Sequence, residues 1–193
     1  MNKKEERRQK SHEAIMASAT ALLRERGIKA SSVIDVMKGA GLTVGGFYRH
    51  FESKEHLFEH AIRTGATWTK LLESARGESV RERAMSIVRL YVSRAHRDTP
   101  EEGCILPSAA PEAARAGEPY RSALESVVGD FARQFGEVLG KGPEHRERAL
   151  GLITLMVGAM TLSRAVAGTP LSDDVLRAAK KLAEQALADK AYD

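Results

Sequence analysis

The sequence predicts an all-α protein of about nine helices, and two observations support this prediction. Apolar residues recur at intervals of three and four along most of the 193 residues, as on one face of an amphipathic helix, and no segment alternates apolar and polar residues as a strand does. Ala, Leu, Arg and Glu dominate the composition, and these residues favour helices. Glycines and prolines interrupt the apolar pattern and set the expected helix ends.

Serine and threonine caps, together with glycine breaks, divide the N-terminal part into four predicted helices. The residues that can cap these helices are Ser11, Ser31 or Ser32, Thr43 and Ser53. Gly27 and Gly41 end the first two helices, and apolar residues continue the fourth helix to about Arg76. Residues 1–10 are highly charged, and we expect them to form a frayed arm.

Five more helices are predicted in the rest of the chain. Apolar spacing places them over residues 80–95, 108–116, 124–140, 145–167 and 172–187, the last with Ser172 as its cap. Prolines and glycines make the segment around the short second one irregular. The helix over 145–167 is apolar almost all round its middle, so we expect it to be buried on most sides.

Positive charge is concentrated in the N-terminal third. Residues 1–63 contain twelve Lys and Arg against eight Asp and Glu, whereas residues 64–193 contain eighteen of each, a distribution that suits phosphate binding. The longest apolar stretch, residues 150–162, is too short for a bilayer span, and the polar N-terminus is unlike a signal peptide, so no membrane partner is expected. Cys104 is the single cysteine, which fits a cytoplasmic protein without disulfides.

The run SVIDVMKGAGLTVGGFYRHF, residues 32–51, has the pattern of a helix-turn-helix, two short helices joined by a tight turn. Gly41 allows a positive φ in the turn, the leucine after it fills the core beneath, and Thr43 caps the second, recognition helix. Gly45 and Gly46 lie inside that helix although each costs about 1 kcal/mol relative to Ala. Such a violation indicates a functional site, where bare backbone lets the helix approach the DNA groove; an irregular turn is the alternative.

Side chains around the predicted recognition helix suit DNA contacts. Thr43, Tyr48 and Lys54 can contact phosphates, which position a protein without reading the sequence. Arg49 and His50 could reach base edges or phosphates, and the valine after Thr43 could contact a thymine methyl group. The alternatives are a half-buried core tyrosine at position 48 and a solvated lysine at position 54.

The segment 11–60 resembles the signature of TetR/AcrR-family transcriptional regulators, a first helix ending in glycine and a helix-turn-helix closing in F-Y-x-H-F-x-S-K-E-x-L. The resemblance implies phosphate contacts by Thr43, Tyr48 and Lys54, and base-facing positions for Val44, Gly45, Gly46 and Arg49. One departure is Gly45, because the family often has a basic or polar residue there.

The resemblance further implies two domains, an N-terminal three-helix DNA-binding domain over 1–52 and a C-terminal helical effector-binding and dimerisation domain over 53–193. The expected partners are a palindromic double-stranded DNA operator, a small-molecule effector and a second copy of the chain. The last two predicted helices would form the dimer interface, unless their apolar residues are core of the monomer. The family function is a repressor that a small molecule, electrophile or oxidant releases; an activator or a ligand-independent DNA-binding protein is the alternative.

Candidate ligand contacts share large apolar or sulfur-containing side chains that could equally be plain core. They are Trp68, Met85, Tyr91, Cys104, Phe131, Phe135 and Met156. Cys104 lies at the start of a predicted helix, whose N-terminus favours a thiolate, whereas Glu101 and Glu102 oppose it. Some members of the wider family sense electrophiles or oxidants through a cysteine in this region, so Cys104 is either a redox sensor or a small buried residue.

Other chemistry has weaker support in the sequence. His56 and His60 have a spacing that can bind metal, but no third ligand accompanies them, and we expect neither a metal nor a cofactor. No phosphate-binding loop or nucleophile elbow is present, so we do not expect an enzyme. A cysteine nucleophile at position 104 with His96 or His145, or a protein–protein module, are the remaining alternatives.

Overall fold

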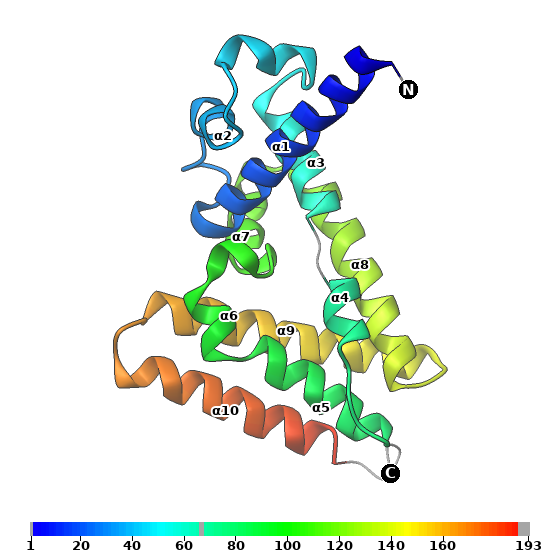
Figure 1. The fold of residues 1–193 in the computed structure, drawn as a ribbon. Helices are drawn as coiled ribbons and strands as arrows, with labels where there is room; N and C mark the ends of the chain where they lie inside the picture. Colours follow the sequence, from blue (N-terminus) through cyan, green and yellow to red (C-terminus); the bar gives the residue numbers. More distant parts are fainter. Residues whose placement is uncertain (1, 66–67, 189–193) are drawn as a thin grey trace. The chain divides into compact units, whose positions relative to one another are not determined.

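The computed structural model describes residues 2–65 and 68–188, and in these residues it contains helices and turns but no strands (Figure 1). The predicted all-α fold is confirmed. The 3-10 helices are named η, and the elements are α1 (Lys3–Arg26), α2 (Val33–Gly39), η1 (Val44–Arg49), α3 (Lys54–Thr64), α4 (Trp68–Glu73), α5 (Val80–Tyr91), α6 (Arg94–Asp98), η2 (Pro100–Glu102), α7 (Leu106–Ala116), α8 (Tyr120–Leu139), α9 (Pro143–Ala165) and α10 (Pro170–Ala186). Each helix of this described part is too short or too polar to cross a bilayer.

The chain forms two compact units, and each contains segments that are distant in the sequence. The first unit comprises Met1–Ala66 and Ser108–Val127, and the second comprises Thr67–Pro107 and Val128–Asp193. The predicted division after residue 52 separates a DNA-binding part from an effector part, and this functional boundary stays a prediction.

Helix α1 begins earlier than the sequence predicts. The Asn2 side chain accepts a hydrogen bond from the backbone N–H of Lys4 at 3.2 Å, and the Glu5 carboxylate accepts one from the N–H of Asn2 at 3.4 Å. This capping box supplies acceptors at the helix N-terminus, so the prediction of a frayed arm over 1–10 is wrong for the described residues 2–10. Ser11, the predicted cap, lies well inside α1.

Two of the predicted helices are broken in the structure. The predicted fourth helix ends at Gly65, whose carbonyl oxygen accepts a hydrogen bond from the Arg24 guanidinium at 2.9 Å. The predicted fifth helix ends at Tyr91, because Ser93 caps a new short helix by accepting from the N–H of His96 at 3.1 Å. The apolar spacing continues through both points, but the hydrogen bonds made there end the helices.

The first unit joins α1, α2 and α3 to the later helix α7. Apolar side chains of α1 form its buried stripe, and Glu112 of α7 reaches the chain just after α1 ends. The Glu112 carboxylate accepts hydrogen bonds from the backbone N–H groups of Ile28 and Lys29, the latter at 2.9 Å. A residue 84 positions away thus satisfies backbone donors beyond the C-terminus of α1.

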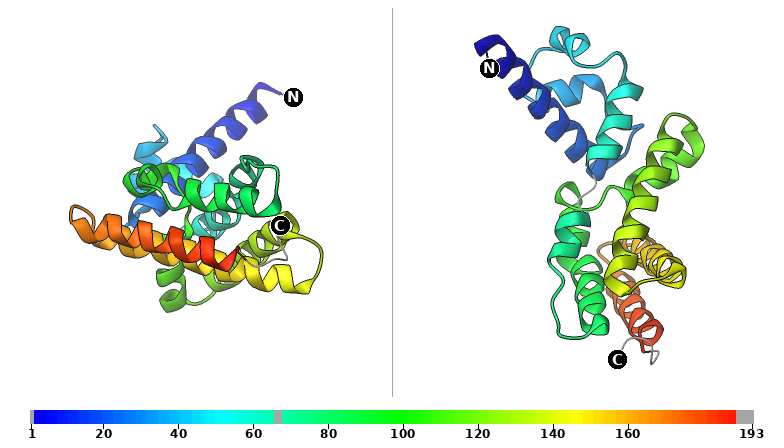
Figure 2. Two further views of the ribbon diagram at one scale, coloured as in Figure 1. Left: turned by 90° about the horizontal axis from the view of Figure 1, so that it is seen from below. Right: turned by 90° about the vertical axis from the view of Figure 1, so that its right-hand side faces the viewer.

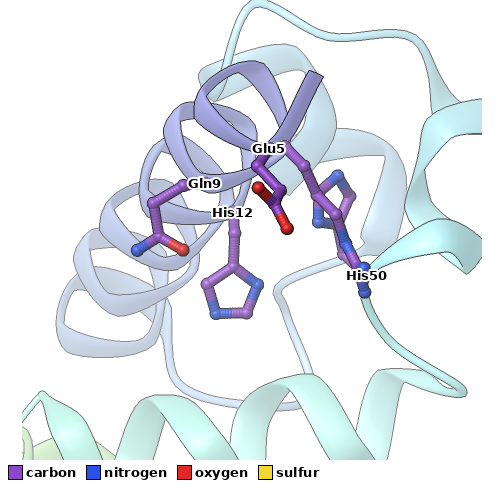
Figure 3. A pocket seen from close by; sticks show the side chains of 5 residues that line it. Glu5, Gln9, His12 and His50 are labelled. Carbon is purple, nitrogen blue, oxygen red and sulfur yellow. The ribbon is translucent and has the colours of Figure 1, made fainter. Parts of the chain in front are cut away.

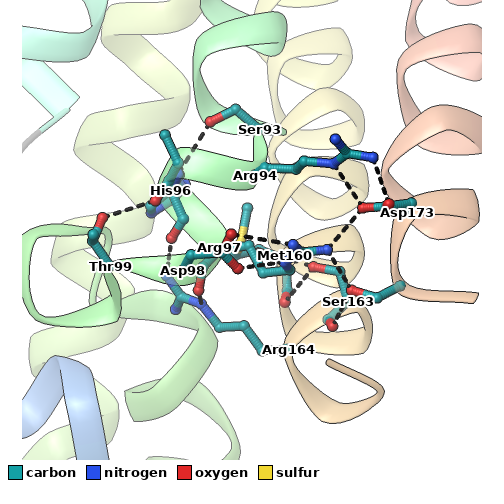
Figure 4. Close-up of polar contacts among 12 residues, drawn as sticks. Ser93, Arg94, His96, Arg97, Asp98, Thr99, Met160, Ser163, Arg164 and Asp173 are labelled. Carbon is teal, nitrogen blue, oxygen red and sulfur yellow. Dashed lines mark hydrogen bonds and ion pairs between the residues drawn. The ribbon is translucent and has the colours of Figure 1, made fainter. Parts of the chain in front are cut away.

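The second unit is built on α9 and α10, which lie side by side, with α5 packed against them (Figure 2). Arg97 of α6 binds Asp173 of α10 at 2.9 Å, and Arg94 binds the same carboxylate (Figure 4). These guanidinium groups lower the pKa of Asp173 below its usual range. Ser172, the predicted cap of α10, instead donates to the carbonyl of Ser163 at 2.7 Å, and α10 begins earlier, at a proline.

Glu112→Ala should lower the free energy of unfolding by about 1–3 kcal/mol, because the buried N–H of Ile28 loses its charged acceptor. Urea denaturation measures this change. Arg115→Ala, on an exposed position of the same helix, is the control and should change stability by less than about 0.5 kcal/mol. Equal effects of the two substitutions would contradict a special role for the Glu112 carboxylate.

Candidate nucleic-acid interface

The predicted helix-turn-helix is present, and its first helix and turn have the expected geometry. Ser32 caps α2 by accepting from the N–H of Asp35 at 3.1 Å, and the Asp35 carboxylate accepts from the Ser32 hydroxyl. Hydrogen bonds from Ser32 lower the pKa of Asp35. Gly41 has a φ of 69°, as the predicted tight turn requires, and the next N–H donates to the carbonyl of Met37 at 2.9 Å.

The segment predicted as the recognition helix is a 3-10 helix, η1, rather than an α-helix. Thr43 occupies its N-cap position but makes no capping hydrogen bond with its side chain, which corrects the predicted cap. Gly45 and Gly46 explain the difference, because two adjacent glycines weaken α-helical propensity within a six-residue segment. Buried Phe47 holds η1 against the rest of the first unit.

The outer surface of η1 combines exposed side chains with bare backbone. Tyr48 is 75% exposed, which excludes the half-buried core tyrosine, and Val44 is 42% exposed. Thr43 and Arg49 are exposed as well. No atom lies within 4 Å of the position that a Cβ atom of Gly45 would take. The surface is therefore open for close approach by a partner.

Lys54 is the first residue of α3, which begins five residues after the end of η1. Ser53 caps α3, as predicted, by accepting from the N–H of His56 at 3.1 Å. Lys54 is half-buried, and its Nζ lies 5.6 Å from the centre of the Phe58 ring, so its ammonium group is partly held by a cation–π contact. The solvated lysine considered from the sequence remains an alternative, since Lys54 keeps part of its surface exposed.

His12, His50 and His60 form a histidine cluster next to the end of η1, which was not predicted from the sequence. The ring of His12 in α1 lies 5.9 Å from His50 (Figure 3). It also lies 5.9 Å from His60 and stacks on Phe51 at 5.0 Å. Burial lowers the pKa of His12 and of His50, with further lowering by neighbouring positive charge. His12 comes from a helix 38 positions away from His50, so no local pattern could have revealed the pair.

The candidate ligand contacts all belong to the second unit, and all are buried. Trp68 stacks on Phe131 with ring centres 4.8 Å apart, and Phe131 lies 5.9 Å from Phe135. Tyr91 and Cys104 form a separate polar group. The structure thus groups Trp68, Phe131 and Phe135 into one stack and places Tyr91 with the thiol of Cys104.

Cys104 is 6% exposed and sits in a defined set of hydrogen bonds. Its backbone N–H donates to Nε2 of His96 at 2.9 Å, and Nδ1 of His96 lies 2.7 Å from the carbonyl oxygen of Tyr91. A carbonyl can only accept, so Nδ1 carries the proton and Nε2 is the acceptor. The Cys104 Sγ in turn accepts from the N–H of Leu106, the first residue of α7, at 3.4 Å.

His96 is therefore a positioning residue for the Cys104 backbone, and this arrangement differs from a nucleophile–base pair. Arg164 holds the same segment by donating to the carbonyl of His96 at 2.6 Å (Figure 4). Burial raises the pKa of the Tyr91 hydroxyl well above its usual range, and the Cys104 thiol adds to the effect. Among the described residues, no group of three His, Cys, Asp or Glu side chains could hold a metal ion, His56 and His60 included.

Comparison with known proteins connects this geometry to a family. Residues 15–61 match the model of the bacterial regulatory proteins of the tetR family. The repressor KstR2 of Mycobacterium tuberculosis is 37% identical over 54 residues, which span 28% of this chain and 27% of KstR2. The repressor NemR of Escherichia coli is 25% identical over 150 residues, covering 75% of this chain and 74% of NemR.

Solved structures extend the likeness to nearly the whole fold. The reduced form of Escherichia coli NemR has a TM-score of 0.71 at 20% identity, covering 89% of this chain and 95% of NemR. A TetR regulator from Chloroflexus aurantiacus has a TM-score of 0.77 at 22% identity, covering 95% of this chain and 97% of that one. Residues 15–61 are therefore similar to the N-terminal domain of the tetR-family regulators, and the chain as a whole has the fold of the solved TetR structures.

Proposed function

We propose that the protein is a dimeric transcriptional repressor that binds a palindromic operator and leaves it when an effector or oxidant acts on the second unit. The observation that carries this proposal is the outer surface of η1, where exposed side chains flank bare glycine backbone. This segment follows α2, whose N-terminus is capped as a helix-turn-helix requires. The similarity to KstR2 and NemR, both of them repressors, supports repression over activation.

The proposed DNA contacts divide into two kinds. Thr43, Tyr48 and Lys54 would bind phosphates, which fixes the position of the protein on the duplex. Val44 and Arg49 would face the base edges, together with the backbone of Gly45 and Gly46, and His50 at the end of η1 would reach base edges or phosphates. Gly45 and Gly46 contribute no side chain, so their role would be to let the backbone approach the major groove.

A homodimer through α9 and α10 is supported by an uncovered apolar face. The sequence predicts burial of α9 on most sides, yet Leu162 is 59% exposed, and on α10 Leu171 is 56% and Leu182 is 54% exposed. On α9, Gly151 and Gly158 have no atom within 4 Å of the position that a Cβ atom would take. Exposed leucines beside small residues suit close packing against a symmetry-related helix pair.

The proposed signal enters at Cys104 or at the aromatic stack. An apolar effector would contact the buried set Trp68, Met85, Tyr91, Phe131, Phe135 and Met156. An oxidant would act on the thiolate of Cys104, which takes an oxygen atom from hydrogen peroxide to give a sulfenic acid and hydroxide. The larger sulfenic acid would disturb the hydrogen bond from the Leu106 N–H, at the point where α7 begins.

Helix α7 gives this disturbance a route along the chain. Its first two residues belong to the second unit, and the remainder, including Glu112, belongs to the first. Glu112 holds the backbone that follows α1 through its bonds to Ile28 and Lys29. An inducer acts only if it binds the DNA-incompetent state more tightly, so the proposal requires that a change at the start of α7 weakens operator binding.

Operator selection from random duplex DNA with the full-length protein tests the proposed function. We expect enrichment of a palindrome whose half-sites lie about one helical turn apart, bound by two chains in sedimentation measurements. Failure to enrich any sequence, or binding by a single chain, would overturn the repressor model. If neither small molecules nor oxidants release the protein from the operator, the result would favour the alternative, a ligand-independent DNA-binding protein.

Lys54→Ala should weaken binding to all sequences alike and reduce the slope of log K against log salt by about 0.9, because one phosphate contact is lost. Fluorescence anisotropy at several salt concentrations measures both quantities. Lys70→Ala removes the same charge from an exposed position of α4 and should leave the slope nearly unchanged. A change of base preference without a change of slope would assign Lys54 a different role.

Thr43→Ala should weaken operator binding while changing the free energy of unfolding by only a few tenths of a kcal/mol, since its hydroxyl caps nothing. Ser53→Ala is the matched comparison and should lower that free energy by about 1 kcal/mol, because it removes a real cap. Urea denaturation and anisotropy separate the two effects. A stability loss in Thr43→Ala as large as in Ser53→Ala would argue for a structural role.

Cys104→Ser should bind operator normally under reducing conditions and resist release by hydrogen peroxide, since no other cysteine is present. The measurement is anisotropy of labelled operator before and after peroxide, followed by a thiol reductant to restore binding in the wild-type protein. Unchanged release in Cys104→Ser would reject the oxidant-sensing part of the proposal while leaving the DNA-binding part intact.

A further inference from the structure

The N-terminal turns of α1 and the end of η1 enclose a positively charged cleft of about 560 Å³. Its lining includes four permanently charged side chains, Lys4, Arg7, Arg8 and Arg49. Glu5 is the carboxylate in the same lining, and it accepts a hydrogen bond from the capping N–H of Asn2. The cleft therefore has a net positive charge that the first unit itself does not neutralise.

The four cations keep their charge available for a partner. In the described residues, none of Lys4, Arg7, Arg8 and Arg49 has a carboxylate oxygen within the 4.0 Å of an ion pair, although Glu5, Glu6 and Glu13 lie on the same helix. A cleft lined by charges of one sign focuses their field and raises the local concentration of anions. A phosphate diester is an anion to which arginine and lysine side chains donate strong, charge-assisted hydrogen bonds.

His50 lines both this cleft and a neighbouring one of about 540 Å³, as do Glu5 and Arg8, whereas His12 lines only the neighbouring cleft (Figure 3). Arg8 and His12 face His50 from α1, Arg49 adjoins it in the chain, and Glu5 shares its lining. Burial, then His12, Arg8 and Arg49, lower the pKa of His50.

The environment of His12 favours its neutral form as well. Its neighbours are His60 from α3, His50, and Arg8 and Glu13 from its own helix. Burial, His60 and Arg8 lower the pKa of His12, and only Glu13 raises it. A bound anion would oppose the positive neighbours of both imidazoles, so it would favour their protonated forms.

We propose that this cleft binds a backbone phosphate of the operator through Arg8 and His50, and that binding is accompanied by proton uptake at His50 and His12. The inference rests on the proposed function and extends the DNA interface to turns of α1 that precede the family match at residues 15–61. Because the complex then holds more protons than its free components, operator affinity rises as pH falls, by at most about tenfold per pH unit for each proton taken up.

The first test compares one arginine substitution with one lysine substitution, both on α1 of the full-length protein. Arg8→Ala removes a cleft cation, whereas Lys10→Ala removes an equal charge that does not line the cleft. We expect Arg8→Ala to weaken operator binding about tenfold and to reduce the salt slope by about 0.9, with a much smaller change for Lys10→Ala. Equal behaviour of the two variants would overturn the cleft proposal.

The second test measures the proton linkage. Operator affinity of the wild-type protein between pH 6 and 8 should fall with rising pH, and His50→Gln should flatten this dependence while still binding at the upper end. His145→Gln, a histidine of the second unit, is the control and should keep the wild-type profile. NMR titration of the His50 ring should give a higher pKa with operator than without it, and an unchanged pKa would overturn the linkage.

These results separate the two proposals. If Lys54→Ala weakens binding but Arg8→Ala and His50→Gln do not, the repressor function stands and the cleft is not a phosphate site. If the wild-type protein binds no DNA at any pH, the proposed function itself fails. Circular dichroism of every variant, compared with the wild-type spectrum, confirms that a loss of binding is not a loss of folding.

Discussion

Burial of the Phe47 side chain is the constraint on which the outer surface of η1 depends. Phe47 is 1% exposed and packs at 5.9 Å from Phe51, which is itself buried. With that ring fixed, the following Tyr48 must point outward, and the two glycines before it present backbone rather than side chains. A short 3-10 segment with two adjacent glycines has little intrinsic stability, so its shape comes from this one anchored ring rather than from helix propensity.

Local signals in the sequence predict some of the caps and turns that hydrogen bonds between near neighbours form, although the caps at Asn2 and Ser93 were missed. Ser32 and Ser53 cap the helices that they were expected to cap, and Gly41 adopts the positive φ that the turn needs. The helical type of η1 could not be predicted in the same way. It depends on the balance between two glycines and a buried phenylalanine, and the burial is a tertiary property.

Several features that escaped prediction join residues far apart in the chain. Glu112 binds backbone 83 and 84 positions away, Arg24 binds the carbonyl of Gly65, and His12 meets His50 across helices. No periodic pattern marks such residues, because each is an ordinary polar side chain on a helix. The candidate DNA contacts were named from local motif and resemblance, whereas the charged cleft beside them needed the fold.

The lone thiol has a consequence for experiments on motion. Cys104 is the single cysteine and is 6% exposed, so a thiol reagent reaches it mainly when its surroundings open transiently. The rate at which the reagent modifies Cys104 can be compared with the rate for free cysteine. The ratio reports how often the second unit opens transiently around this residue, and no engineered label is needed. Molecules that fill or tighten this interior would slow the reaction, so a simple colorimetric assay could screen for ligands before the operator is known.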